Sequence, residues 1–281
     1  MEKKVAIITG ATGGMGAVTA EAIAKQGFVT ILVGRSRQKG LEVLEVIKKK
    51  TQNPDVFFML TDLSSQQSIR ELVIVFKSKY NRLDLLVNNV GAVFSKRITT
   101  VDGIEMTFAL NHLSYFLLTN LLLDILKSSN PGRIVNISSA THSGVKEKNI
   151  EDWQGQKKYS MIQAYHRSKL ANLLFTYELD RRLKGSGVTV NAVKPGFTKS
   201  ELGKNAGGFI SIILRLMSVL MTKSTEEGAE TAIYLSTSNE VDGISGKYYD
   251  KKNQITSSKS SYDTKLALQL WNLSEKLTKL N

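Results

Sequence analysis

The chain has 281 residues, 42% of them hydrophobic, and no cysteine, which excludes disulfide bridges and thiolate metal sites. This length can bury one large core, and we expect residues 1–281 to form a single domain. The formal net charge is +13, but the basic residues are scattered and not interleaved with aromatic residues, so we expect a solvated surface and no nucleic-acid partner.

Short apolar runs alternate with helical stretches along most of the chain. The expected strands cover residues 5–9, 29–33, 56–60, 83–88, 133–138 and 188–193, with a last strand in 246–253. The expected helices cover residues 17–26, 41–50, 68–80, 110–126, 164–183 and 226–237, with further candidates at 207–221 and 262–280. The pattern predicts an α/β fold: a single Rossmann-type, doubly wound parallel sheet of about seven strands with helices on both faces.

A glycine-rich turn, TGATGGMG, follows the first strand and precedes the first helix. Gly10, Gly14 and Gly16 let the chain turn sharply and let backbone N–H groups approach a pyrophosphate at the positive end of the helix. A Walker phosphate loop is excluded because no Gly-Lys-Ser/Thr closes the segment. A turn that binds nothing is the remaining alternative.

Two further polar segments follow strands of the same sheet. Asp62-Leu63 comes after the third strand, and Asn88-Asn89-Val90-Gly91 after the fourth. The carboxyl ends of strands in a doubly wound sheet form the edge where ligands bind. The three segments together therefore predict a dinucleotide site.

The chain resembles the classical short-chain dehydrogenases/reductases over nearly its whole length. The family's turn motif matches at Thr9, Gly10, Gly14 and Gly16, its Asn-Asn-Ala-Gly motif at 88–91 with Val90 in place of alanine, and its Pro-Gly at Pro195-Gly196. This resemblance implies a nicotinamide dinucleotide cofactor. The residues that it assigns to the cofactor are Gly10, Thr12, Gly14, Met15, Gly16, Arg35, Arg37, Asp62, Leu63, Asn89, Val90, Gly91, Tyr165, Lys169, Pro195, Gly196 and Thr198.

The end of the second strand distinguishes NAD from NADP. A carboxylate there would bond the adenosine ribose and repel a 2′-phosphate, but this chain has Gly34 followed by Arg35 and Arg37. Cations at this place favour the extra phosphate through charge-assisted hydrogen bonds, so we expect NADP(H) rather than NAD(H). The alternative is that Arg35 points into solvent and the preference is weak.

Tyr165-His166-Arg167-Ser168-Lys169 places a phenol and an amine one turn apart on one face of a predicted helix. A free tyrosine titrates near 10, and a neighbouring cation would favour the phenolate and lower that pKa toward working pH. Tyr248 and Lys252 have the same spacing, but they lie in the last predicted strand and its turn, where such a pair does not share a face in this way. The pattern favours Tyr165 as a proton donor and acceptor.

The resemblance completes a catalytic set with Ser139 and Asn111. Ser139 ends the fifth strand, and Ser138 is its close competitor, since strand alternation points the two side chains in opposite directions. Family similarity favours Ser139. It implies that Ser139 bonds the substrate oxygen, Tyr165 supplies the proton, Lys169 bonds the nicotinamide ribose, and Asn111 holds a water linking Lys169 to solvent. No metal is expected, because His112, His142 and His166 form no ligand-like cluster.

Two segments beyond the nucleotide site carry the substrate information: an insert at 140–163 and an expected lid at 204–223. Residues 207–221 are apolar but short and interrupted by Arg215, so a membrane span is not expected. Three interpretations stay open for them: a lid over an apolar substrate, a core helix, or a peripheral contact with a lipid surface. His142 and Trp153, in the insert, are candidate pocket residues without an assignment.

The insert and the C-terminal region resemble the retinol dehydrogenase and WW-domain oxidoreductase-like branch. This implies an NADP(H)-dependent oxidoreductase that interconverts a lipophilic aldehyde or ketone with its alcohol by hydride transfer. The alternative is a non-catalytic NADP(H)-binding sensor or interaction protein. Residues 115–126 are apolar and serve either a homodimer interface or the core. We expect a cytoplasmic protein with at most a peripheral membrane contact, since no signal or anchor pattern is found.

Overall fold

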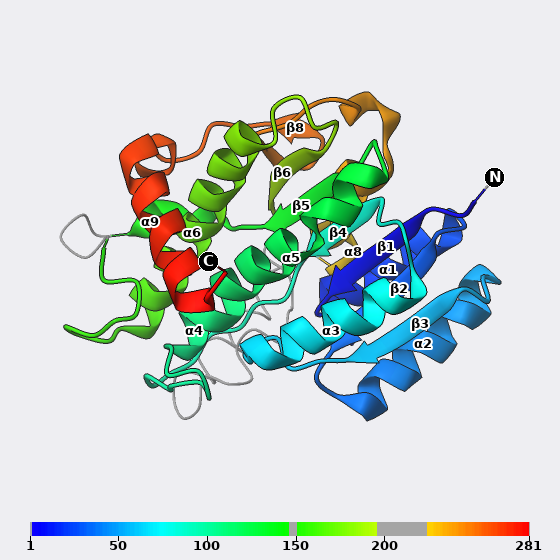
Figure 1. Ribbon diagram of the computed structural model, residues 1–281, viewed down its shortest axis with the longest axis horizontal. Coiled ribbons are helices and arrows are strands. Elements are labelled where there is room, and N and C mark those ends of the chain that lie inside the picture. The colour runs from blue at the N-terminus through cyan, green and yellow to red at the C-terminus, as the bar shows by residue number, and fades with distance from the viewer. Residues whose placement is uncertain (1, 146–150, 196–223, 281) are drawn as a thin grey trace.

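The computed structural model describes residues 2–145, 151–195 and 224–280, in which one sheet has the strand order β3-β2-β1-β4-β5-β6-β7-β8 (Figure 1). The strands are β1 (Val5–Thr9), β2 (Val29–Gly34), β3 (Val56–Leu60), β4 (Leu85–Asn88), β5 (Arg133–Ile137), β6 (Thr189–Lys194), β7 (Lys247–Asp250) and β8 (Asn253–Gln254). All neighbouring pairs are parallel except β7 and β8. The predicted parallel α/β sheet is confirmed, with a short antiparallel edge strand in addition.

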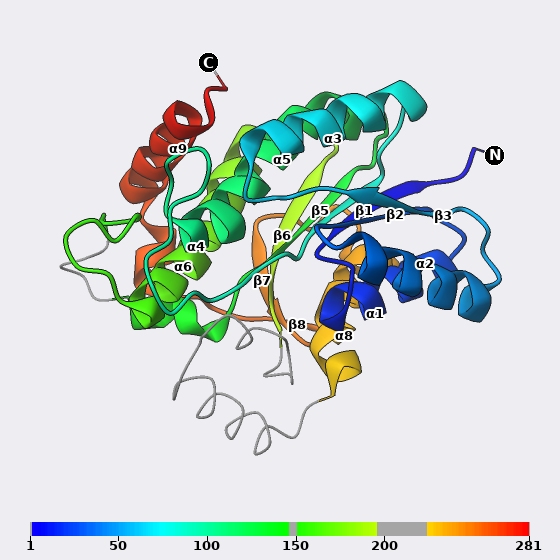
Figure 2. The same cartoon turned by 90° about the horizontal axis from the view of Figure 1, so that it is seen from below.

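Helices cover both faces of the sheet, as predicted. The α-helices are α1 (Gly14–Lys25), α2 (Arg37–Thr51), α3 (Gln66–Lys79), α4 (Met106–Phe108), α5 (Ser114–Ser128), α6 (Met161–Arg182), α8 (Thr225–Thr237) and α9 (Thr264–Thr278). The shorter elements are η1 (Ala109–Leu113), η2 (Ala140–Gly144), η5 (Asn239–Val241) and η6 (Lys259–Tyr262). Figure 2 shows α3 and α5 on one side of the sheet and α1, α2 and α8 on the other.

Small polar side chains begin most of these helices. Ser36, Ser65 and Ser160 each accept the backbone N–H three residues on, which satisfies one free donor of the first turn. Ser224 and Glu227 form a reciprocal capping box at the start of α8. These bonds place several helix starts a few residues earlier than apolar periodicity alone predicts.

Alternate residues of the central strands enter two apolar cores. Ile7 packs with α3, α5 and α6 on one face, while Ile8 packs with α1, α2 and α8 on the other, and both are fully buried. Such strands, covered on both sides, are the reason for the continuously apolar runs in the sequence.

Most of the apolar run at 115–126 contributes to the core. Tyr115, Phe116, Leu117, Leu118, Leu122, Ile125 and Leu126 are buried inside the chain. The segment Met106–Ser128 is long and apolar enough to cross a membrane, but 72% of its most apolar window is buried within the fold. Its buried apolar side chains are therefore packed against α3, α6 and α9.

Two predicted boundaries differ from the structure. The helix expected over 110–126 begins at Met106 and passes through a π-helical turn, η1, before α5. Glu105 causes the early start because its two carboxylate oxygens accept the N–H groups of Thr107 and Phe108 at 2.8 Å. The strand expected over 83–88 runs from Leu85 to Asn88. Asp84, directly before it, donates its N–H to the Val5 carbonyl at 2.9 Å and accepts the N–H of Val5 on its carboxylate at 2.8 Å.

Candidate functional site

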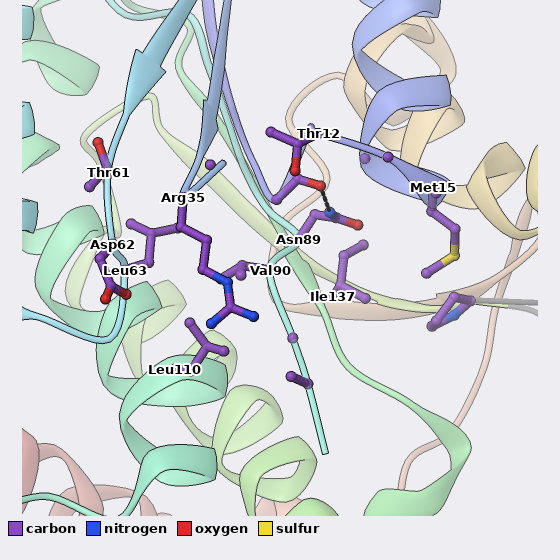
Figure 3. A pocket seen from close by; sticks show the side chains of 18 of the residues that line it. Thr12, Met15, Arg35, Thr61, Asp62, Leu63, Asn89, Val90, Leu110 and Ile137 are labelled. Atoms are coloured by element: carbon purple, nitrogen blue, oxygen red, sulfur yellow. Dashed lines mark hydrogen bonds between the residues drawn. The ribbon is translucent and has the colours of Figure 1, made fainter. Parts of the chain in front are cut away.

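A cleft of about 230 Å³ opens at the carboxyl ends of β1, β2 and β4, where strand order reverses (Figure 3). This is the position at which doubly wound sheets bind ligands. Fourteen of the residues that the sequence assigns to a cofactor line it: Gly10, Thr12, Gly14, Met15, Gly16, Arg35, Asp62, Leu63, Asn89, Val90, Gly91, Tyr165, Lys169 and Pro195. Arg37 is exposed in the first turn of α2 and is not among the lining residues, while Gly196 and Thr198 lie outside the described residues.

The glycines of the first loop are fixed by backbone geometry and space. Gly10 and Gly14 adopt φ values of +65° and +56°, which side chains with a Cβ rarely adopt. A Cβ on Gly16 would collide with the carbonyl oxygen of Gly10, and one on Gly34 would collide with the side chain of Thr12. The loop therefore passes close to the ends of β1 and β2, and α1 begins directly at the cleft.

Thr9 ties this loop to the segment after β4, a role that the sequence analysis did not identify. Its hydroxyl accepts the N–H groups of Asn89 and Val90 at 2.8 and 3.1 Å, and the Asn89 amide donates back to the Thr9 carbonyl at 2.9 Å. Tyr115 then donates its hydroxyl to the Val90 carbonyl at 2.8 Å. The match of Thr9 to the family motif was the only sign of this role in the sequence. Its hydrogen-bond partners could not be predicted, because they depend on the register of β1 against β4.

Arg35 lines the cleft from the end of β2, with Asp62 and Leu63 nearby (Figure 3). Among the described residues no carboxylate forms an ion pair with it. Asp62 instead accepts the N–H and the hydroxyl of Ser64 at 2.9 and 2.7 Å. The Arg35 guanidinium is thus an exposed cation without a fixed acidic partner in the described part of the chain.

Tyr165, Lys169 and Ser139 come together at the inner end of the cleft. The Lys169 amine lies 5.6 Å from the centre of the Tyr165 ring and donates to the carbonyl of Ile137, the last residue of β5, at 3.1 Å. The Ser139 side chain lies close enough to Tyr165 to lower the pKa of that phenol. The helical spacing of four therefore does place phenol and amine on one face, next to the end of β5.

Desolvation shifts the pKa values of Tyr165 and Lys169. Desolvation raises the pKa of Tyr165 to about 12, against the smaller opposing effect of the Ser139 side chain. The same cause lowers the pKa of Lys169 to about 7. The expectation that Lys169 would lower the pKa of Tyr165 is wrong for this structure, because desolvation dominates at the phenol and burial also disfavours the ammonium form of the lysine.

The two serines after β5 point in different directions, as strand alternation predicts. Ser138 is fully buried and donates its hydroxyl to the carbonyl of Lys169 at 2.8 Å. Of the two serines, only Ser138 is among the residues that line the cleft. Ser139 accepts the N–H and hydroxyl of Thr141 at 3.2 and 3.1 Å. With both donors from Thr141 in place, the Ser139 proton is free to be donated.

Asn111 lies in the π-helical turn η1, and such turns often occur at functional sites. Its amide accepts the N–H of Ala92 at 2.8 Å and donates to the Ala92 carbonyl at 2.9 Å and to the Ser168 hydroxyl at 3.1 Å. A Cβ added to Gly91 would lie 3.4 Å from the Lys169 amine and 3.7 Å from the Asn111 oxygen, so both polar groups border the same glycine. Asn111 thus holds the strand end against the helix that carries Lys169.

Comparison with known proteins identifies the family. The sequence model described as short chain dehydrogenase matches residues 4–208. The chain belongs to the short-chain dehydrogenase family. It is an oxidoreductase of this family, whose members use nicotinamide dinucleotide cofactors.

Relatives place the chain in the retinol dehydrogenase-like branch of the family. Polyprenol dehydrogenase of Homo sapiens is 42% identical over 98% of this chain and 85% of its own length. Retinol dehydrogenase 13 of Homo sapiens is 42% identical over 99% and 85%, and retinol dehydrogenase 12 of Mus musculus 40% identical over 96% and 85%.

Solved structures share the fold. A crystal structure of an uncharacterised protein from Mycobacterium paratuberculosis superposes with a TM-score of 0.77 at 31% identity, covering 98% of this chain and 93% of that one. The NADP active-site complex of RhlG from Pseudomonas aeruginosa gives a TM-score of 0.68 at 25% identity, covering 87% and 93%.

The cleft fits the dinucleotide that the family uses. No described atom lies within 4 Å of a Cβ added to Gly13 or Gly14, so among the described residues the loop presents bare backbone to the cleft. The start of α1 offers a positive helix end beside this loop. No group of three His, Asp or Glu side chains suited to a metal ion occurs in the described ranges.

Proposed function

We propose that this protein is an NADP(H)-dependent oxidoreductase that interconverts a lipophilic aldehyde or ketone with its alcohol. The observation that carries the proposal is that the Tyr165 phenol and the Lys169 amine line the dinucleotide cleft together, with the Ser139 side chain next to Tyr165. A bound nicotinamide would supply or accept the hydride, and the protein supplies positioning and protons.

The described side chains have separate roles in the proposed reaction. In the reduction direction Ser139 donates a hydrogen bond to the substrate oxygen and Tyr165 delivers the proton as negative charge develops there. Lys169, whose amine borders Gly91, would hold the ribose of a bound cofactor, and its ammonium form would return a proton to the Tyr165 phenolate after reduction. Asn111 keeps Ala92 and Ser168 in place, and its oxygen is the candidate holder of a water between Lys169 and solvent.

The NADP preference is supported by the charge at the end of β2. Gly34 provides no carboxylate, and Arg35 borders the cleft with no acidic partner in the described residues. A structural relative at 25% identity is known as an NADP complex. Arg35 therefore bonds the adenosine 2′-phosphate, whereas Arg37 adds only a more distant positive charge.

The apolar substrate class is supported by the relatives. Their names refer to polyprenol and retinol, which are long, largely hydrocarbon alcohols. The insert at 140–163 and the proposed lid at 204–223 would form the substrate side, with 207–221 the candidate contact to a lipid surface. All of 204–223 lies outside the described residues. Screening NADPH oxidation against graded-chain aldehydes, retinal and steroid ketones tests this class.

The test of the chemistry is Tyr165→Phe. Removing the phenolic oxygen deletes the proton donor but keeps the ring, so turnover should fall by about 100-fold or more while the dissociation constant for NADPH changes little. The measurements are kcat with the best aldehyde found and NADPH binding by fluorescence titration. Retained turnover would refute the assignment of Tyr165. A wild-type protein that binds NADPH but turns over none of these carbonyl compounds would favour the non-catalytic sensor instead.

A further inference from the structure

His142 lies buried in η2, three residues after Ser139, and no role in the proposed reaction uses it. Its Nδ1 lies 2.6 Å from the carbonyl oxygen of Ser139, and its Nε2 lies 2.9 Å from the backbone nitrogen of Ser258. The ring therefore bridges the turn that begins at Ser139 and a segment more than one hundred residues further along the chain.

The two partners determine the protonation of the ring. The Ser258 nitrogen can only donate, so Nε2 of His142 must be the acceptor and carry no proton. The Ser139 carbonyl can only accept, so Nδ1 carries the proton. His142 is thus neutral and in one tautomer, in agreement with the lowering of its pKa by burial.

On one side this ring fixes the backbone of Ser139. The Ser139 carbonyl accepts both the Nδ1 proton and the backbone N–H of His142, the second at 3.3 Å. The direction of the Ser139 hydroxyl depends on this backbone, because a serine side chain has only one heavy-atom rotation. The bond from His142 therefore restrains the hydroxyl that meets Tyr165.

On the other side, the ring accepts a hydrogen bond from Ser258, whose neighbours pack against α6. Tyr177 of α6 stacks on Tyr262 with the ring centres 5.1 Å apart, and its hydroxyl lies 2.8 Å from the Ser257 hydroxyl. Tyr248 of β7 meets the His142 ring edge to face at 5.4 Å. The segment that bonds His142 is thus attached to α6 by ring packing and a hydrogen bond.

We propose that His142 is a positioning residue for the reaction. Its Nε2 is held by the N–H of Ser258, within residues 255–262, and its Nδ1–H holds the backbone of Ser139, which fixes the position of the Ser139 hydroxyl. The inference rests on the proposed function, since it concerns the same serine. It makes residues 255–262, far from the cofactor motifs in the sequence, a support of the active site.

Two pairs of variants test the proposal. His142→Asn retains an amide N–H near the position of Nδ1, whereas His142→Phe retains the ring on Tyr248 but neither hydrogen bond. Ser258→Pro removes the N–H that His142 accepts, and it is compatible with the φ of −65° at this residue. Ser258→Ala is its control, because the Ser258 hydroxyl has no hydrogen-bond partner within the described residues. Ser143→Ala, in the same turn and exposed, controls for general effects on η2.

The expected result is a loss of kcat without a loss of cofactor binding. Misplacement of a reacting group lowers rates on the order of 10- to 100-fold, so His142→Phe and Ser258→Pro should lower kcat by about that factor with the NADPH dissociation constant nearly unchanged. His142→Asn should recover most of the kcat lost in His142→Phe, and Ser258→Ala and Ser143→Ala should match the wild type. Thermal unfolding and circular dichroism confirm that each variant is folded.

Three outcomes would overturn the proposal. One is a folded His142→Phe with wild-type kcat, and another is equal loss in Ser258→Pro and Ser258→Ala. The third is a uniform fall in stability and NADPH binding with no specific effect on kcat, which would show a structural role alone. Absence of turnover in the wild-type protein would instead refute the proposed function. The three outcomes above require an active wild type, so they concern the role of His142 alone.

Discussion

Two neighbouring groups at the cleft, the Tyr165 phenol and the Lys169 amine, have pKa values displaced in opposite directions by one cause. Burial penalises the charged form of each, raising the pKa of Tyr165 to about 12 and lowering that of Lys169 to about 7. The neutral phenol is the form that can give a proton to a carbonyl oxygen during reduction. After that step the phenolate has to regain a proton, which only the ammonium form of Lys169 can donate, and the lowered pKa of Lys169 allows the amine to exchange protons near neutral pH.

Residue spacing alone predicted part of this arrangement. The interval of four placed Tyr165 and Lys169 on one face, and strand alternation separated Ser138 from Ser139. The direction of the Tyr165 pKa was not predictable, because it depends on how deeply α6 is buried by α9, η2 and the sheet. The bonds of His142 to Ser139 and Ser258 were equally inaccessible, since the chain separation between those residues carries no local pattern.

The proposed preference for NADPH depends on one side chain, Arg35. We expect Arg35→Ala to lower the ratio of kcat/KM with NADPH to that with NADH by about 10- to 100-fold, the worth of a hydrogen bond to a charged group. Arg37→Ala is the matched control and should change the ratio little, because Arg37 is not among the residues that line the cleft. Steady-state kinetics with both cofactors measure the ratio, and an unchanged value in Arg35→Ala would remove the argument.

Among the elements, the glycine loop and the core strands follow directly from their sequence. The π-helical turn η1 does not, because a period of 3.6 cannot reveal where one wider turn interrupts a long apolar helix. The placement of α9 was also not predictable. Its amphipathic pattern indicates a helix with one buried face, but nothing local indicates that this face packs against α6 and the start of α5.

The contribution of α9 is measurable at Trp271. This buried ring lies 4.9 Å from the Phe116 ring and 5.9 Å from the Phe175 ring, and the Arg182 guanidinium lies 4.0 Å above it. Trp271→Ala should lower the free energy of unfolding by about 3–5 kcal/mol, as for other buried aromatic truncations. Leu268→Ala, on the same helix but 47% exposed, is the control and should change it by about 0.5 kcal/mol or less. Urea unfolding measures both, and equal effects would show that α9 is not packed through Trp271.

At the scale of the whole molecule, polar side chains inside the fold link its layers. His112 in η1 is fully buried, with Nδ1 3.3 Å from the Asn172 oxygen of α6 and Nε2 3.1 Å from the Ser274 hydroxyl of α9. Three helical elements that are far apart in the sequence therefore meet at one imidazole. Desolvation lowers the pKa of His112 to about 3, so the folded protein keeps this ring neutral where an unfolded chain would protonate it.

This difference in proton binding predicts how global stability depends on pH. An unfolded histidine titrates near 6.5, so between pH 6.5 and about 3 the unfolded chain binds one proton more than the folded chain at His112, and stability falls as the pH falls. Between pH 7.5 and pH 5 this group alone should lower the free energy of unfolding by about 2 kcal/mol. His112→Gln, which cannot titrate, should show a loss over the same interval that is smaller by that amount. Urea unfolding at the two pH values gives the comparison, in which other titrating groups such as His142 cancel because both proteins contain them. Equal losses in the two proteins would mean that the ring can be protonated without leaving the folded state.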